Sequence, residues 1–467
     1  MKRLLYVFVM LIAFSACEDD YEYTFDKTPT ERRAEAKSEL TRLLEAPEFG
    51  WKTTIIVHGE ISSAGDFFVM KFEPKGEYNN GEVTVANGFK SHKSEFEIGH
   101  EDGILLRFNT YNEVFHWLTK PNHWETAGFG GDLEYIFMKE EAGKLFFQGK
   151  ESQNEIILEK ATEQDWDMTG ILKNHENFMQ ALSKNFVAIT VTNGFGATEE
   201  KPFYAKFNLA DVYITATAVP EKEGWFYEFE YLVDGEKEYG QEGSYVFTHD
   251  EIIFSEPVII KGDTLDRIAY NKDNDLWEVT NEGIEGFLEA SALPLMPSPG
   301  AVDNFVNIFA NGTYGWDISP WNFGDEGKIE EFAMGIYKEC EMFDWFYVYG
   351  DYTNSAGEHL GAGFVIEGSG DNYGKYAFLP LEFEKLAESE MKFIWNGDII
   401  SDIEGAEEVI NSDPNIQGML NAFCNPVGWS IFVSSYFYTP TYEIYPYEFY
   451  NMEDPSIILK RVWSINY

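Results

Sequence analysis

The sequence predicts a mostly β protein with flanking helices (α+β), built from antiparallel meander units. From Trp51 to about Lys160, short runs of alternating apolar and polar residues follow one another, separated by Gly, Asn and Asp. Aromatic residues make up 17% of the chain and glycines number 40, a mixture that suits strands joined by tight turns. A helical pattern precedes the first of these runs.

That pattern predicts an amphipathic helix over residues 29–45. Thr28 can cap it, Pro29 takes the first helical position, and Glu31 completes a capping box. Pro47 ends it. The apolar stripe of this helix consists of Ala36, Leu40, Leu43 and Leu44.

Strand patterns follow this helix in two series. The first comprises "GWKTTIIVHG", "DFFVMKFEP", "GEVTVANGF", "SEFEIGHEDG", "ILLRFNTYNEVFHWL", "LEYIFMKEE", "KLFFQGKE" and "NEIILEKA". A second helix is expected around 164–183, and a second series of strands runs from "FVAITVTN" to "LDRIAYNKDNDLWEV". "SEFEIGHEDGILLRF" and "GSYVFTHDEIIFSEP" both carry a Ser, an aromatic residue, a His and an acidic residue at similar spacing. We therefore expect a loose internal duplication of helix plus meander. Chance similarity among strand–turn–strand units is the alternative.

The C-terminal part predicts a mixed module. "SALPLMPSPGAVDNF" is the best candidate for a linker. Beyond it, strands alternate with helices near 380–389 and 404–423, and Pro414 restarts the second of these helices. The expected boundaries are 1–16 signal peptide, 17–28 acidic tether, 29–163 helix plus β-meander, 164–293 helix plus second β-meander, 294–302 Pro-rich linker and 303–467 α+β module.

The N-terminus predicts a lipid anchor. Lys2 and Arg3 precede an apolar run over residues 4–14 that is too short to span a membrane, and small residues then lead to Cys17. This resembles a bacterial lipoprotein signal, in which Cys17 carries acyl chains such as palmitate and becomes the mature N-terminus. An ordinary secretory signal with a free thiol is the alternative. The acidic residues 18–20 resemble a surface-export signal, and a solvated spacer is the other interpretation.

The charge of the chain bears on nucleic-acid binding, and its cysteines bear on disulfide formation. With 34 basic against 81 acidic residues, the net charge is −47, which repels phosphate backbones, so we expect no nucleic-acid partner. Cys340 and Cys424 could pair in an oxidising compartment or remain buried thiols.

A family resemblance adds a biological setting. Following the Cys17 motif, "TFDKTPTERRAEAKSELTRLLEAPEFGWKT", "LLRFNTYNEVFHWL" and "GGDLEYIFM" resemble the Bacteroidota lipoproteins of domain-of-unknown-function family 4302. The similarity is clearest over residues 25–160. It implies an accessory lipoprotein of an outer-membrane nutrient-uptake locus, near TonB-dependent transporters, and it carries over no catalytic residue.

Motifs for common chemistries are missing from the sequence. There is no HExxH pair, no G-x-S-x-G elbow, no phosphate-binding GxxxxGK[ST] and no CxxC. "NKDNDLWE" at 271–278 alternates oxygen-bearing side chains that could face calcium, although Leu276 stands where an EF-hand loop needs glycine. A strand-connecting turn is the favoured interpretation. We expect no metal, cofactor or catalytic residue.

Two aromatic clusters are the candidate ligand sites. "YGWDISPWNFG" at 314–324 is expected to be a loop, and "SSYFYTPTYEIYPYEFYNMED" at 434–454 is dense in tyrosine. Exposed rings could stack on sugar faces, whereas the alternative is that they fill β-domain cores. The candidate ligand-binding residues are Trp316, Trp321, Asp317, Asn322, Tyr442 and Tyr445.

These features together predict a membrane-anchored accessory lipoprotein, more probable at the cell surface than on the periplasmic face of the outer membrane. It would bind a nutrient, either glycan or peptide, or dock to a TonB-dependent uptake complex, without catalysis. One alternative is a hydrolase of glycosidase or peptidase type whose site is assembled from distant loops. Another is an adhesion or scaffold lipoprotein.

Overall fold

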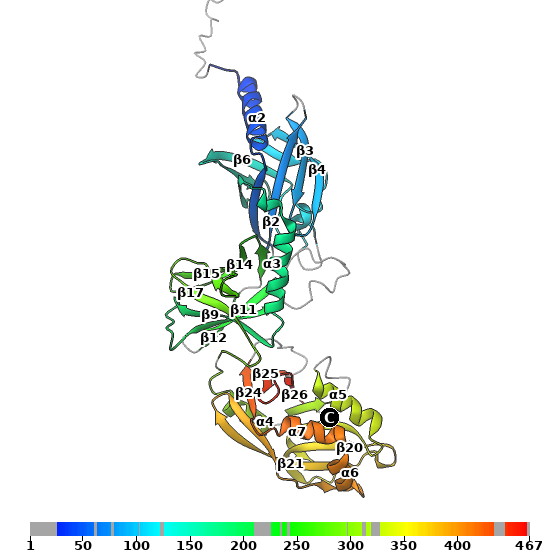
Figure 1. Cartoon of the computed structure of the whole chain (residues 1–467). Helices are drawn as coiled ribbons and strands as arrows, with labels where there is room; N and C mark the ends of the chain where they lie inside the picture. Colours follow the sequence, from blue (N-terminus) through cyan, green and yellow to red (C-terminus); the bar gives the residue numbers. More distant parts are fainter. Residues whose placement is uncertain are drawn as a thin grey trace, which may run out of the picture. The chain divides into compact units, whose positions relative to one another are not determined.

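The computed structural model describes residues 26–464 except 60–62, 76–78, 102, 122–125, 210–225, 234–235, 241–242, 297, 311–313, 319–326 and 434–443 (Figure 1). The protein is mostly β with antiparallel sheets and flanking helices, so the predicted fold class is confirmed. The chain forms two compact units. The first comprises residues 1–172, 212–225 and 244–249, and the second comprises 173–211, 226–243 and 250–467.

Helix α2 (Pro29–Glu45) opens the described chain with the predicted capping box. The Glu31 amide donates to the Thr28 hydroxyl at 3.3 Å, and the Thr28 amide donates to the Glu31 carboxylate at 2.8 Å. The apolar stripe buries Leu40 and Leu44 completely. The helix packs against three strands of the sheet that follows, β2, β4 and β5.

Eight strands of the first unit form a closed barrel in chain order. They are β1 Trp51–His58, β2 Ser63–Pro74, β3 Asn80–Ala86, β4 Ser91–His100, β5 Ile104–Phe108, β6 Glu134–Glu141, β7 Lys144–Gly149 and β8 Glu155–Lys160. The predicted meander is therefore confirmed. Its closure, in which Trp51 pairs with Lys160 and Lys52 with Glu159, is an additional finding.

The strand predicted over 104–118 ends ten residues early, at Phe108. Asn112 is the cause, because its side-chain oxygen accepts hydrogen bonds from the amides of Val114 and Phe115, both at 3.1 Å. This turn leads into a short 3₁₀ helix, η1 (His116–Thr119). Since Val114, Phe115 and the η1 residues His116 to Leu118 are buried, the segment packs inward instead of continuing the sheet.

The seam of the barrel requires a glycine. Gly50 has φ +73°, and a Cβ there would overlap the Met70 carbonyl oxygen. The Gly50 carbonyl accepts from the Ala161 amide at 2.9 Å, just beyond β8. The Trp51 indole donates to the Leu44 carbonyl at 2.9 Å, which joins the end of α2 to the same seam.

A second helix and sheet repeat this plan. Its elements are η2 Gln164–Trp166, α3 Met168–Ala181, β9 Phe186–Asn193, β10 Phe203–Leu209, β11 Phe226–Val233, β12 Glu236–Tyr239, β13 Gly243–Phe247, β14 Glu251–Ile260, β15 Asp263–Asn271, β16 Leu276–Val279 and β17 Glu285–Ser291. The nine strands are ordered β10-β9-β17-β16-β15-β14-β13-β11-β12, and β10 also pairs with β11. Without β12, the remaining eight strands form a cycle in chain order.

The C-terminal module has the same cyclic order with extra helices. Its elements are α4 Ala301–Ala310, β18 Tyr314–Ile318, α5 Lys328–Glu339, β19 Phe343–Thr353, β20 His359–Gly368, η4 Gly370–Asn372, β21 Tyr376–Ala387, β22 Glu390–Trp395, β23 Ile400–Ser401, α6 Ala406–Ser412, α7 Pro414–Phe423, β24 Trp429–Val433, β25 Ile444–Asn451 and β26 Ile458–Ser464. Apart from β23, its strands again form an eight-membered cycle, because β20 pairs with β21 and β18 with β26. Helix plus eight-strand meander therefore occurs three times, where two copies were predicted.

The helices of the C-terminal module share one core with its strands. Residues of α4, α5, α6 and α7 pack together with those of all the module's strands except β23, and α5 lies beside α7 (Figure 1). The predicted restart at Pro414 is confirmed, since the Asp413 carboxylate accepts from the amides of Asn415 and Ile416 at 2.9 and 3.0 Å. Helix α4 begins at Ala301, inside the range predicted as linker, and Met296 and Ser298 of that range are buried.

The helix predicted over 380–389 is wrong, because these residues continue β21. Glu, Lys, Leu and Ala in "LEFEKLAE" favour a helix, but cross-strand packing overrides this preference. Phe383 pairs with Phe393 of β22, and their rings meet edge to face at 5.7 Å.

The second unit buries a lysine between two of its sheets. Lys206 of β10 is 6% exposed, and its ammonium lies 4.1 Å from the ring centroid of Phe432 on β24. The Nζ atom is 3.7 Å from Glu230 and 3.9 Å from Glu448, whose side chains are 0% and 18% exposed. One buried cation thus neutralises carboxylates from two different sheets.

Replacing this lysine should destabilise the second unit. Lys206→Met leaves two shielded carboxylates without this counter-charge, so we expect a loss of about 3–5 kcal/mol in unfolding free energy. Urea denaturation followed by circular dichroism measures the loss. Lys201→Met, at an exposed position, is the matched control and should change little. Equal midpoints for the two variants would contradict this account of Lys206.

Candidate functional site

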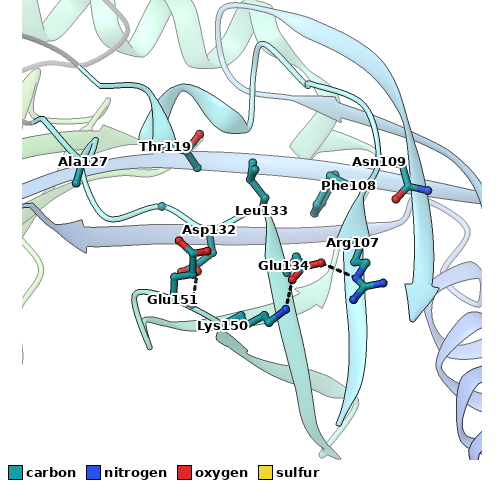
Figure 2. Close-up of a pocket in the computed structure, with 11 residues that line it drawn as sticks. Arg107, Phe108, Asn109, Thr119, Ala127, Asp132, Leu133, Glu134, Lys150 and Glu151 are labelled. Carbon is teal, nitrogen blue, oxygen red and sulfur yellow. Dashed lines mark hydrogen bonds and ion pairs between the residues drawn. The ribbon is translucent and has the colours of Figure 1, made fainter. Parts of the chain in front are cut away.

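A polar pocket of about 510 Å³ lies on the first barrel (Figure 2). It is lined by the end of β5, the connection from β5 to β6, the start of β6 and the turn after β7. The lining residues are Arg107, Phe108, Asn109, Thr119, Ala127, Gly131, Asp132, Leu133, Glu134, Lys150 and Glu151. Pockets of this volume accommodate small molecules.

One wall of the pocket carries a network of two cations and two carboxylates. Arg107 and Glu134 are cross-strand partners on β5 and β6, and Arg107 Nε lies 2.6 Å from the Glu134 carboxylate. Lys150 contacts the same carboxylate. Both cations also contact Glu101, with Lys150 Nζ at 2.7 Å. The hydrogen bond from Lys150 is the main reason why the pKa of Glu101 lies below its usual value.

A buried aspartate shapes the adjacent wall. Asp132 is 4% exposed, and its carboxylate accepts from the amides of Glu151 and Ser152 at 2.7 and 3.2 Å and from the Ser152 hydroxyl. A Cβ at Gly149 would overlap this carboxylate, so the turn after β7 needs a residue without a side chain there. Asp132 therefore holds the turn in place and has little hydrogen-bonding capacity left for a ligand.

The remaining lining groups are hydroxyl, amide and apolar. The Thr119 hydroxyl donates to the His116 carbonyl at 2.8 Å, and its lone pairs can still accept from a ligand. Asn109 offers an amide on the same rim. Phe108 is buried against Phe115, with ring centroids 4.6 Å apart, whereas Leu133 is 49% exposed. The pocket thus offers a small apolar surface beside many polar groups.

A second acidic residue, Asp66 of β2, belongs to a separate polar cluster of the same unit. Its carboxylate accepts from the Asn87 amide at 2.8 Å, the Trp117 indole at 3.1 Å and the Phe67 backbone amide at 2.8 Å. Burial nevertheless raises the pKa of Asp66 to about 7, against the opposing effect of these bonds. Asp66 does not line the pocket.

Burial lowers the pKa of His116 to about 4, with a smaller effect from His92. The Asn112 amide donates to Nδ1 of His116 at 3.0 Å, so the neutral ring carries its proton on Nε2. The His116 ring contacts the rings of Phe108, Phe115 and Tyr111. His116 is therefore a neutral packing residue at physiological pH.

Metal-binding arrangements do not occur among the described side chains, where no three His, Cys, Asp or Glu residues converge to hold an ion. The calcium hypothesis for 271–278 gives way to the turn interpretation. Asn271 pairs with Leu276 at the ends of β15 and β16, and the amides of Asn271 and Asn274 donate to Glu278 at 2.9 and 2.8 Å. Cys340 and Cys424 are free thiols.

The predicted aromatic site is not an exposed platform at Trp316. Within the loop expected over 314–324, residues 314–318 form strand β18, in which Trp316 pairs with Val348 of β19. The Trp316 ring is fully buried and meets Phe449 edge to face at 5.1 Å, so the core alternative is correct for this ring. Asp317 and Tyr445 lie on β18 and β25, with side chains outside the description. Outside the described residues altogether are Cys17, Trp321, Asn322 and Tyr442.

Sequence reasoning missed the barrel pocket. An isolated arginine in "ILLRF" and a glutamate before "YIFM" have no recognisable spacing, because 26 intervening residues separate the two sides of the pair. Only the register that sets Arg107 opposite Glu134 brings them together. The available signal was the alternation of apolar and polar residues in "ILLRF", which places Arg107 on the outer face of the strand.

The described part of the chain is thus a multi-module β protein with a polar pocket on its first barrel. Residues 21–272 match the family model described as a domain of unknown function, DUF4302, and the chain belongs to this family. No curated protein matches the chain. No helix in the part of the chain that the structure describes is long and apolar enough to cross a membrane.

The Asp66 carboxyl should show a pH signature. In the folded protein it binds a proton below about pH 7, whereas its ordinary pKa is 3.8. Between these values the folded state holds the extra proton, so the contribution of Asp66 to unfolding free energy falls as pH rises from 4 to 8. Asp66→Asn should remove this dependence, on the order of 1–2 kcal/mol for a partly exposed group.

Urea denaturation at several pH values measures the unfolding free energy of the wild type and of Asp66→Asn. The exposed Asp26→Asn variant is the control and should run parallel to the wild type. A carboxyl carbon resonance of Asp66 that titrates near pH 4 would contradict the raised pKa.

Proposed function

We propose that the protein is a membrane-anchored accessory lipoprotein that binds a nutrient glycan in the barrel pocket without catalysis. The pocket is the observation that carries this proposal. Its lining combines amide, hydroxyl, guanidinium and carboxylate groups with the exposed Leu133. Such a set can donate to and accept from sugar hydroxyls while one apolar face of the ring rests on an aliphatic side chain.

Barrel closure favours a glycan over an extended peptide. Peptides often bind by adding a strand to an exposed sheet edge, where main-chain hydrogen bonds supply the affinity. The described strands of the first barrel are paired in a closed cycle, so the barrel lacks the two free edge strands of an open sheet. A compact ligand that fits a side-chain pocket suits this architecture better.

The engagement of the pocket carboxylates favours binding over hydrolysis. A glycosidase needs one carboxyl group that donates a proton and another that attacks or activates water. Here Asp132 is bound within its turn and Glu134 is paired with two cations. Asp66, the acid whose raised pKa would suit proton donation, is bonded to Trp117 and Asn87 and does not line the pocket.

The sequence supports the anchored setting. The Cys17 motif provides a site for acyl chains, and more than one chain is needed to hold a protein stably at a bilayer. The acidic residues after Cys17 and the net charge of −47 suit a body displayed away from anionic headgroups. In this setting the bound glycan would pass to a TonB-dependent transporter of the outer membrane.

A glycan panel tests binding at the pocket. With the chain from Glu18 onward, which keeps every described residue, we expect at least one oligosaccharide to bind by titration calorimetry. Asn109→Ala should weaken that binding by about tenfold, because one amide partner is lost. Asn274→Ala, on the β15–β16 turn, should leave it unchanged. Equal affinities for the two variants would place the glycan site elsewhere.

Metabolic labelling tests the anchor. Cells that express the full chain and receive a radiolabelled fatty acid should incorporate label into the wild type but not into Cys17→Ala. The variant should also leave the membrane fraction, because it lacks acyl chains. An unlabelled wild-type protein that still starts at Met1 would refute the anchoring.

A further inference from the structure

We propose that the pocket selects acidic sugars, and that the sugar carboxylate competes with Glu101 for Arg107 and Lys150. This inference rests on the proposed function and names its ligand class. The relevant geometry is the charged wall formed by Arg107, Lys150, Glu134 and Glu101 (Figure 2 draws the first three).

The two carboxylates in this wall are not equivalent. Glu134 stands on β6, lines the pocket and is fixed by its pairing across to β5. Glu101 comes from the turn between β4 and β5, does not line the pocket and has a side chain that is 47% exposed, against 29% for Glu134. Glu101 is therefore the carboxylate that can turn into water more readily than Glu134.

The two cations face both the pocket and Glu101. Arg107 and Lys150 line the pocket, and their side chains are 23% and 33% exposed. A guanidinium next to an ammonium is a strong site for a carboxylate, because charge-assisted hydrogen bonds are about twice as strong as neutral ones. Both cations belong to the minority charge of the chain, in which 34 basic residues stand against 81 acidic ones.

Charge balance explains why an anion can enter an acidic protein. With Glu101 in place, the wall holds two positive and two negative groups. If a ligand carboxylate displaces Glu101, the two cations still face two carboxylates, those of Glu134 and the ligand. Glu101 then becomes hydrated. Exchange of one carboxylate for another thus leaves the cations neutralised at every stage. Two further carboxylates line the pocket. Asp132 is held by the donors of its turn, and Glu151 is exposed and screened by water.

The sugar part of the ligand accounts for the rest of the lining. A uronic acid carries ring hydroxyl groups beside its carboxylate, and the Asn109 and Thr119 side chains that also line the pocket are suitable partners for them. The exposed Leu133 supplies an apolar contact. We therefore assign the pocket to a hexuronate unit of an acidic oligosaccharide.

The test compares two matched probes, an oligogalacturonate and its methyl ester, in which a small methyl group replaces the carboxylate charge. Titration calorimetry with the chain from Glu18 onward should show that the acid binds at least about tenfold more tightly than the ester. Glu101→Gln should tighten binding of the acid several-fold, because the internal competitor no longer carries charge. Lys150→Met should weaken it about tenfold.

Lys93 provides the matched control. It bridges Glu73 and Glu82 on the same barrel, at 3.1 and 2.7 Å, and does not line the pocket. Lys93→Met should therefore leave affinity for the acid unchanged. Thermal unfolding checks that Glu101→Gln and Lys150→Met remain folded.

The outcomes of these titrations distinguish this inference from the proposed function. If the ester or another neutral glycan binds at the pocket while Glu101→Gln leaves affinity for the acid unchanged, the acidic-sugar inference fails and glycan binding stands. If no glycan binds, both fail. A peptide with a free C-terminal carboxylate that binds more tightly than the oligogalacturonate, and loses affinity when amidated, would also overturn the assignment to sugar acids.

Discussion

Closure of each strand cycle by backbone hydrogen bonds is the constraint on which the architecture depends. In the first barrel, two residue pairs between β1 and β8 complete the circle, and Gly50 lets the chain enter it beside the Met70 carbonyl. An open sheet of this length would expose ladder groups on both edges, which invites association with other chains. The second and third modules have the same cyclic strand order, so this arrangement occurs three times along the chain.

Local chemistry allowed much of this fold to be predicted. The α2 capping box, the alternating strands and the Asp413–Pro414 helix start all depend on neighbouring residues, and all are present. Features set by distant partners were missed. The segment 380–389 has helix-forming residues, but Phe393 across the sheet makes it a strand. Trp316 lies among Gly and Pro residues, yet its strand is defined by pairing with β19, and the rings of Phe305, Phe423 and Phe449 cover it.

The same distinction explains why the candidate site could not be read from the sequence. Arg107, Glu134 and Lys150 become neighbours through strand register, and register depends on the full set of pairings in the barrel. With 81 acidic residues, no spacing marks which carboxylates will meet a cation. The pocket is also formed by a connection that leaves the sheet at Phe108, and the turn at Asn112 that directs it is a weak signal until its hydrogen bonds are seen.

Because Lys206 is buried between two sheets, its chemical reactivity depends on whether those sheets stay packed together. An amine that lies beneath the Phe432 ring and between two glutamates is shielded from water-borne reagents, whereas most other lysines of the chain lie at the surface. A reagent that acylates accessible amines would therefore pass over Lys206 until β10 and β24 separate. The rate at which this one position becomes modified would report how often those sheets part in the otherwise folded protein.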